Sequence, residues 1–244
     1  MGIHIMNFIL SIISGVIIGW IIRGMTYLYD SRGNLEIAIK AIFYRNRDIR
    51  LSLSYIFRIE VEGKYLLVKG NRINQYQPVG GAYKMLTSFQ QGKRDFKLLD
   101  DNCIPIDQVS KDDLRVRLKG KKLMEFLKWF NSRKNREVGV HREYYEEMIA
   151  TKILPYESYT NFTPEFLKSI CTGIRDSVKY KIKELNIYDV YEIKLSESEI
   201  KSVYEFLKTN PKEAILASSN DIESGHILIE GVSHQIGGHT EYLL

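Results

Sequence analysis

One short stretch of this chain alternates apolar and mostly polar side chains, and it constrains the fold more than any other. Apolar residues occupy every odd position from Leu51 to Val61. A period of two predicts a β-strand with one buried face. The turn-forming residues 62–64, Glu-Gly-Lys, and a second apolar run over residues 65–69 then predict a hairpin. We therefore expect these residues to begin a sheet.

Residues 142–147, Arg-Glu-Tyr-Tyr-Glu-Glu, gather three carboxylates. On an α-helix Glu143, Glu146 and Glu147 share a face, because residues three and four apart are neighbours. Hard divalent ions such as Mg²⁺ take oxygen ligands and are often completed by substrate phosphate. The cluster therefore predicts a magnesium and phosphate site. A solvated helix face with the same glutamates is the alternative.

Two adjacent glycines, Gly80 and Gly81, lie in a loop expected over residues 72–83. Paired glycines let the backbone approach a ligand or another element closely. We expect them to bind a ligand beside the glutamates.

The stretch from Ile5 to Ile22 contains no charged residue. As a helix it would reach about 27 Å, close to the thickness of the hydrocarbon layer. We expect a transmembrane helix in residues 1–24 and a juxtamembrane linker or helix over residues 25–50. A cleaved signal peptide is the alternative, but no Lys or Arg precedes the run.

The basic residues that follow this run predict a single-pass protein of the cell inner membrane, with its soluble domain in the cytoplasm. Ser11, Gly15 and Gly19 form a small-residue stripe that would allow such helices to associate into a homo-oligomer. Glycine is also common in membrane helices in general, which is the alternative explanation.

Residues 111–136 contain ten Lys or Arg against three Asp or Glu, a net charge of +7 in a chain whose total is +5. Apolar residues at helical spacing over residues 121–131 predict a basic helix here, packed beside the Gly-Gly loop. Its charge would suit nucleotide phosphates or the anionic inner leaflet, or it is a solvated face. We expect Cys103 and Cys171 to be free thiols in a reducing compartment.

The remaining residues predict helices and strands in alternation. Thr163 and Pro164 are typical helix-start residues, and we expect a helix after them. Its inward residues would be Phe166, Leu167, Ile170, Ile174, Val178 and Leu185. The residues from Ser196 to Glu199 form a capping box that predicts another helix. Strands are expected over residues 189–195, 213–217 and 226–230, and His239 is expected to be structural.

The hairpin, the Gly-Gly loop and the glutamate helix occur in an order that resembles a Nudix hydrolase domain. The matching residues are Gly81, Arg142, Glu143, Tyr144, Glu146 and Glu147. Three features depart from the signature: residues 82–141 separate the glycine from the helix, Lys134 replaces a glutamate that pairs with the arginine, and Ile149 replaces a glycine. The resemblance implies an α/β (α+β) fold, a Nudix-like α/β/α sandwich over residues 51–244 with an insert at about 82–137.

The membrane stretch, the lengthened box and the ending Gly-Gly-His-Thr-Glu-Tyr-Leu-Leu are similar to the SMODS-associated Nudix family. The resemblance implies an effector of cyclic-oligonucleotide-based antiphage signalling (CBASS), functionally linked to a nucleotidyltransferase that makes a cyclic nucleotide. The leading hypothesis is that the domain binds this nucleotide and the membrane helices then associate and disturb the membrane.

Two other hypotheses stay open. One is a Mg²⁺-dependent hydrolase of diphosphate-linked nucleotides, with Glu143, Glu146 and Glu147 as catalytic and metal-binding residues. Arg58, Lys69 and Arg72 would then bind the phosphates. The other is a scaffold that holds a partner at the membrane, which predicts neither metal nor nucleotide binding.

Overall fold

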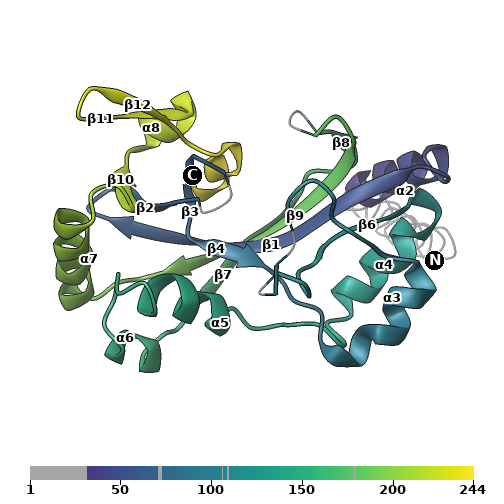
Figure 1. The fold of residues 1–244 in the computed structure, drawn as a ribbon, viewed down its shortest axis with the longest axis horizontal. Coiled ribbons are helices and arrows are strands. Elements are labelled where there is room, and N and C mark those ends of the chain that lie inside the picture. Colours follow the sequence, from purple (N-terminus) through teal and green to yellow (C-terminus); the bar gives the residue numbers. More distant parts are fainter. Residues whose placement is uncertain (1–31, 71–72, 106, 109, 178–179) are drawn as a thin grey trace, which may run out of the picture.

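The computed structural model describes residues 32–70, 73–105, 107–108, 110–177 and 180–244 (Figure 1). The first half comprises α2 (Arg32–Phe43), β1 (Asp48–Val61), β2 (Lys64–Lys69), β3 (Tyr76–Pro78), β4 (Gly80–Ala82), η1 (Thr87–Phe89), α3 (Gln90–Phe96), β5 (Leu99–Asp100), β6 (Arg115–Lys119) and α4 (Gly120–Asn131). The second half comprises α5 (His141–Tyr144), η2 (Tyr145–Ile149), α6 (Glu157–Thr160), β7 (Glu165–Cys171), β8 (Arg175–Asp176), β9 (Lys183–Ile193), α7 (Glu197–Thr209), β10 (Ala214–Ala217), α8 (Ser219–Ser224), β11 (His226–Ile229), β12 (Val232–Gln235) and η3 (Gly238–Leu243).

Strand β1 is the centre of the sheet and runs across most of the molecule (Figure 1). One of its edges pairs in parallel with β9, from Ile49 opposite Lys183 to Ile59 opposite Ile193. Its other edge pairs with β6 over residues 48–52 and with β4 over residues 54–56. The hairpin to β2 is confirmed, and β2 continues the sheet to β10 and β3.

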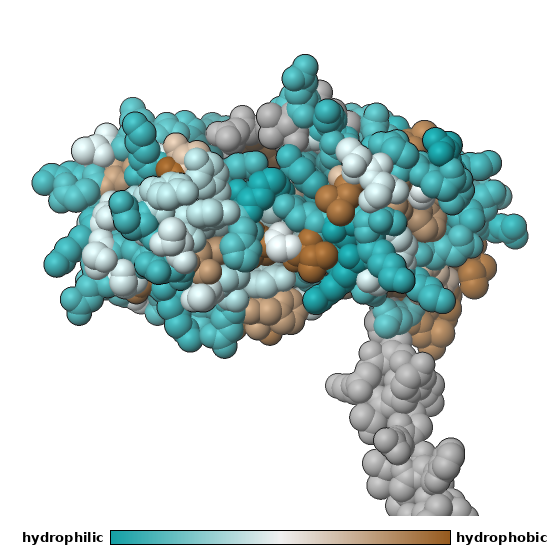
Figure 2. Space-filling model, turned by 90° about the horizontal axis from the view of Figure 1, so that it is seen from below, coloured by the Kyte–Doolittle hydropathy of each residue, from teal (hydrophilic) through white to brown (hydrophobic). Residues whose placement is uncertain are grey.

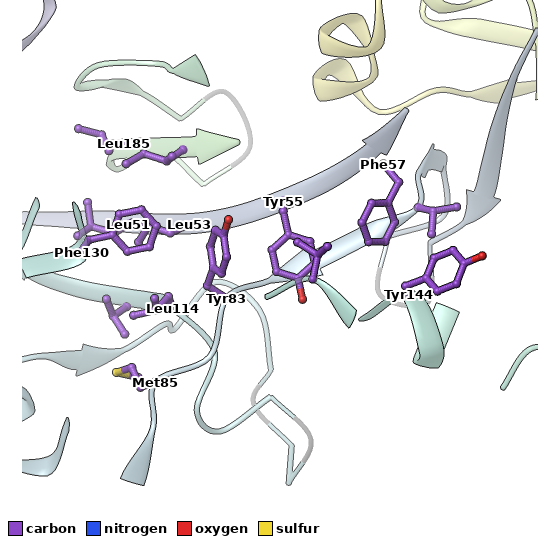
Figure 3. Packing of buried hydrophobic residues seen from close by; sticks show 14 of the residues in the cluster. Leu51, Leu53, Tyr55, Phe57, Tyr83, Met85, Leu114, Phe130, Tyr144 and Leu185 are labelled. Atoms are coloured by element: carbon purple, nitrogen blue, oxygen red, sulfur yellow. The ribbon is translucent and has the colours of Figure 1, made fainter. Parts of the chain in front are cut away.

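Alternation along the strands divides the interior into two cores. The odd-numbered side chains of β1 from Ile49 to Val61 are fully buried, and those from Leu51 to Phe57 lie in one row in Figure 3. This larger core also contains side chains of α2, α4, α5, η2 and α7. Ile56 instead belongs to a second core on the opposite face, with Ile222 of α8 and Leu243 of η3. Helices thus cover both faces of the sheet, and the fold is α+β.

The inserted segment joins the main sheet instead of standing apart from it. Its strand β6 pairs with β1, and its basic helix α4 forms at the expected residues. The expected place of this helix beside the Gly-Gly loop is confirmed only near its end, where Phe130 meets Tyr83 with ring centroids 5.5 Å apart. Gly120 lies against the backbone of Ala41 and Tyr44, so α4 begins against the end of α2 and not at the Gly-Gly strand. The reason is its apolar face, which packs Leu123, Phe126 and Phe130 into the larger core.

The helix expected after Thr163 is wrong, because residues 165–171 form the strand β7, antiparallel to β9. The pairing shifts by one residue between Phe166 and Lys168, which is a β-bulge. An extra residue in a strand breaks its period of two, so Phe166, Leu167 and Ile170 imitate a helical spacing. Leu185 belongs to β9, which begins before the expected strand.

The capped helix and two of the expected strands of the second half are confirmed. Ser196 caps α7 with a complete capping box, in which its side chain accepts from the Glu199 backbone N–H. Strands β10 and β11 lie within the expected ranges. Cys103 and Cys171 are both free thiols.

The uncharged stretch Ile5–Ile22 lies outside the described residues. Among the residues that are described, the structure has no helix with the length and apolar character needed to cross a bilayer.

Candidate functional site

The Gly-Gly strand and the glutamate helix meet at the edge of β1. In β4, Gly81 pairs with Tyr55 and Gly80 pairs with Ile56. A Cβ at Gly80 would overlap the carbonyl oxygen of Tyr55, and one at Gly81 would overlap the carboxylate of Glu143. Both glycines are therefore needed for the packing, and Gly81 is needed because a carboxylate lies directly over it.

Aromatic packing fixes the helix that carries the glutamates. Tyr144 is buried and stacks on Phe162, with ring centroids 3.7 Å apart and planes at 12°. The edge of Tyr144 also meets Phe57 of β1, with centroids 6.1 Å apart (Figure 3). The helix changes from α to π geometry at Tyr145. The π segment is a wider turn of a kind often found at functional sites.

Arg142 organises the acidic cluster. Its Nε and Nη2 donate to the two carboxylate oxygens of Glu137, both at 2.9 Å. Its Nη1 pairs with Glu143 and, at 2.8 Å, with Glu146. Its Nη2 also lies 3.2 Å from the hydroxyl of Tyr55. The guanidinium therefore joins three carboxylates to the central strand.

Glu137 takes the role of the glutamate that the Nudix resemblance places at position 134. Lys134 itself is exposed. The backbone N–H of Glu137 donates to the carbonyl of Lys84 at 2.8 Å, which holds the glutamate beside the residues that follow β4. Sequence reasoning missed Glu137 because its distance from Arg142 departs from the signature. In the sequence, the only sign of it is that Arg142 lacks the glutamate with which the Nudix signature pairs the arginine.

Burial and mutual repulsion raise the pKa values of two glutamates. Burial raises the pKa of Glu143 to about 7, Arg142 opposes this, and Glu147 and Glu146 add to it. Burial also raises the pKa of Glu147, with a contribution from Glu146. The three carboxylates thus influence one another electrostatically, and all three line one pocket. A positive charge placed among them would lower these pKa values.

The described part of the chain contains no group of three or more His, Cys, Asp or Glu side chains arranged to hold a metal ion. Arg142 is bonded to two of the three glutamates. The donor chemistry nevertheless fits a hard cation, because Glu143 and Glu147 are carboxylates that repel each other in a buried setting. Glu143, Glu146 and Glu147 are the residues that would hold Mg²⁺.

A pocket of about 620 Å³ opens from this cluster across the sheet. All three glutamates line it, together with Arg142, Gly80 and Gly81. Even-numbered positions of β1 line it as well, and residues from the inserted segment close another side. These lining residues are Arg50, Ser52, Ser54 and Ile56 of β1 and Ile104, Asp107, Ser110, Asp113 and Arg115 of the insert. Tyr188 and His239 complete the lining on the side of β9.

A buried ion pair ties the insert to the floor of the pocket. Arg50 donates to both carboxylate oxygens of Asp101, at 3.1 and 2.8 Å, and lies 3.5 Å from Glu184. Asp101 also accepts from the Cys103 backbone N–H at 3.0 Å. The arginine holds the pKa of Asp101 below its usual value despite burial. Arg50 is therefore committed to holding the insert in place.

Two of the three basic residues expected at the phosphates fall elsewhere. Arg58 is not among the pocket residues and instead pairs with Glu192 at 2.5 Å and donates to the carbonyl of Leu243 at 2.9 Å. Arg58 has an even number, so its side chain is on the same face of β1 as the pocket. It lies beyond Ile56, however, and under η3. Lys69 is exposed at the end of β2 and does not line the pocket either. Arg72 lies outside the described residues.

A mixed sheet with a Gly-Gly strand packed against an Arg-Glu-Tyr-Tyr-Glu-Glu helix defines a Nudix-type domain. Comparison with protein families gives the same class. The model of the SMODS-associated NUDIX domain matches residues 48–244, and the chain belongs to that family. Comparisons with curated proteins and with solved structures give no match.

Proposed function

We propose that this chain is a membrane-anchored effector of a CBASS antiphage system and that the pocket of its cytoplasmic Nudix-type domain binds a cyclic nucleotide. A nucleotidyltransferase supplies this nucleotide after infection. Binding favours association of the membrane helices of several copies, which disrupts the membrane and leads to growth arrest or cell death. A ligand acts in this way only if it binds the associated state more tightly.

The pocket is the observation that carries this proposal. Its volume of about 620 Å³ is within the range of small-molecule sites. It combines a carboxylate cluster suited to Mg²⁺ and phosphate at one end with two aromatic rings, Tyr188 and His239, on the side of β9. The floor between them carries the small side chains of Ser52 and Ser54. A nucleotide has both kinds of group that such a pocket recognises.

The exposed face of α2 supports the membrane part of the proposal. Ile37 and Ala41 face the core, whereas four large apolar side chains of α2 are turned outward. Their exposed fractions are 56% for Leu35, 59% for Ile39, 71% for Ile42 and 80% for Phe43. Figure 2 shows apolar residues at the right-hand end of the molecule, where Figure 1 places α2. An apolar helix face that begins about ten residues after the uncharged N-terminal stretch suits the bilayer interface.

Calorimetry and sedimentation test this function on the full chain in detergent. A panel of cyclic di- and trinucleotides is titrated with and without Mg²⁺, and oligomeric size is followed by analytical ultracentrifugation. We expect heat of binding and a larger species with one nucleotide class. The variant Ser54→Trp fills the pocket floor and should lose both effects, whereas Ser233→Trp, on exposed β12, should keep them. Absence of heat and of any size change across the panel would refute the proposal.

A Mg²⁺-dependent nucleotide hydrolase is the second candidate, and the arrangement of Glu143, Glu147 and Arg142 at the pocket favours it. Glu143, Glu146 and Glu147 would hold Mg²⁺, which would supply positive charge to the phosphates and lower the pKa of an attacking water. Arg142 would keep the carboxylates in place and offset negative charge on the phosphates. Arg115, which pairs with Asp113, and Lys84 are basic residues of the insert that line this pocket.

Turnover measurements separate the two functions. ADP-ribose and nucleoside diphosphates and triphosphates are incubated with the full chain and Mg²⁺, and phosphate or nucleotide release is measured. A hydrolase would show turnover that Glu146→Gln or Glu147→Gln abolishes with the fold intact. Turnover that survives both substitutions would indicate a contaminating enzyme and would count against this candidate.

A further inference from the structure

Tyr188 and His239 come from distant parts of the sequence and form one aromatic wall of the pocket. Their rings are nearly parallel, with planes at 11° and centroids 5.6 Å apart. The ring of Tyr242 lies against Tyr188 as well, with centroids 5.2 Å apart. Tyr188 and His239 are half-buried and both line the pocket, so a ligand there would meet them.

The segment that carries His239 is held down at several points. The Gly237 backbone N–H donates to the carbonyl of Tyr76 at 2.8 Å. A Cβ at Gly237 would come within 2.6 Å of the Gln75 side chain and within 3.1 Å of the His239 ring, so the segment packs closely at this point. Leu243 is fully buried, and Arg58 donates to its carbonyl. His239 is therefore a fixed part of the pocket wall.

The register of the sheet sets the distance from this wall to the carboxylates. Tyr188 of β9 and Ala82 of β4 both pair with Ser54, one on each side of β1. Neighbouring strands lie about 5 Å apart, so Tyr188 and the Gly-Gly strand are separated by roughly 10 Å. Glu143 lies over Gly81, at the far end of this row. A nucleotide spans such a distance between its base and its phosphates.

We propose that Tyr188 and His239 form the nucleobase subsite of this pocket, on which the base of the bound nucleotide stacks while its phosphates lie toward Glu143, Glu147 and Arg142. This inference rests on the proposed function and assigns the residues that contact the base of the ligand. Ser52 and Ser54 leave the floor open for the sugar between the two ends.

Stacking on aromatic rings suits nucleotide recognition because every base has a flat π-surface. Burial lowers the pKa of His239 to about 4, so the ring is neutral at pH 7 and stacks without a charge to desolvate. The wall thus contributes affinity for the base, and the carboxylate end contributes affinity for the phosphates.

Calorimetric titration of the full chain tests whether the aromatic wall binds the base and the carboxylate end binds the phosphates. The probes are the cyclic dinucleotides of adenine, guanine and uracil, and inorganic pyrophosphate with Mg²⁺ as a probe without a base. The variants are Tyr188→Leu and His239→Ala. Their matched controls are Tyr188→Phe, which keeps the ring, and His234→Ala, whose ring packs on Tyr76 outside the pocket. Thermal melting shows that each variant is folded.

We expect Tyr188→Leu and His239→Ala to weaken binding of the cyclic dinucleotide about fivefold or more and to leave pyrophosphate binding unchanged, since stacking is worth about 1–3 kcal/mol per base. The two controls should bind both probes as the natural chain does. Unchanged dinucleotide binding in both variants would overturn the subsite and leave the proposed function standing. Equal weakening of both probes would also overturn it, because the wall would then support the whole pocket. A natural chain that binds no nucleotide would overturn both proposals.

Discussion

Arg142 donates two parallel hydrogen bonds of 2.9 Å to the carboxylate of Glu137, five residues before it in the chain. Two parallel bonds between a guanidinium and a carboxylate fix orientation as well as distance. Glu137 therefore directs the remaining donors of Arg142 toward Glu143, Glu146 and the Tyr55 hydroxyl. The helix keeps its orientation despite the lysine at position 134.

Replacing Glu137 tests this assignment. We expect Glu137→Ala to lower the free energy of unfolding by about 1–3 kcal/mol, because a half-buried guanidinium loses a charge-assisted pair. Urea denaturation measures this change. Lys134→Ala is the matched control and should have almost no effect, since Lys134 is exposed. The assignment is wrong if the two variants are equally stable.

Gly81→Ala probes the contact between the Gly-Gly strand and the glutamate helix. The added methyl group overlaps the Glu143 carboxylate and must displace it. We expect binding of Mg²⁺ and pyrophosphate to weaken about tenfold or more, which equals at least ~1.4 kcal/mol. Calorimetry measures the affinity. Gly238→Ala serves as control, because a methyl group there meets no atom within 4 Å. Normal binding by Gly81→Ala would show that the position of Glu143 is irrelevant.

Stability should depend on pH through His239. Its pKa is lowered from 6.5 to about 4 by burial, so the unfolded chain takes up the proton more readily than the folded chain. The contribution to stability is present above pH 6.5 and is lost as the pH falls toward 4. Thermal melting of His239→Gln should therefore show a smaller loss over this range than the natural chain. His226→Gln, on an exposed ring, should show the natural loss. An unchanged profile for His239→Gln would contradict the burial of a neutral ring.

The α2 face predicts a contact with lipid. In a Trp20→Phe background reconstituted into bilayers, we expect brominated lipids to quench the fluorescence of Phe43→Trp, because Phe43 is 80% exposed on the apolar face of α2. Tyr156→Trp, at a position 61% exposed before α6, is the control and should not be quenched beyond the remaining Trp129 signal. Equal quenching at both positions would refute a specific contact of α2.

Local signals predicted those parts of the fold in which side-chain period and backbone geometry agree. The alternation of Leu51–Val61 identifies β1, and the capping box at Ser196 identifies the start of α7. The bulge in β7 defeats the same reasoning, because one extra residue changes the period while the backbone stays extended. Local sequence patterns also do not show which strands pair, since the β1–β9 contact joins residues more than a hundred positions apart.

The candidate site likewise has residues that the sequence predicts and residues that it does not. Glu143, Glu146 and Glu147 are predictable because one helix face carries them, and Gly80 and Gly81 because only glycine permits the close approach. Glu137, Tyr188 and His239 come to the site through tertiary packing, and no spacing in the sequence indicates it. Arg58 was a plausible phosphate ligand by charge alone, but its carbonyl and carboxylate partners place it beside η3.

Strand β1 gives its odd side chains to the interior, and its even positions from Arg50 to Ile56 line the pocket. Ser52 and Ser54 make no contribution to either hydrophobic core, so substitutions there change the shape of the pocket without repacking the interior. Folding therefore constrains the choice of side chain at these two positions less than it does at the buried odd positions of the same strand. On the proposed function, relatives with different ligands should differ first at these two floor positions, and new ligand preference can arise there at little cost in stability.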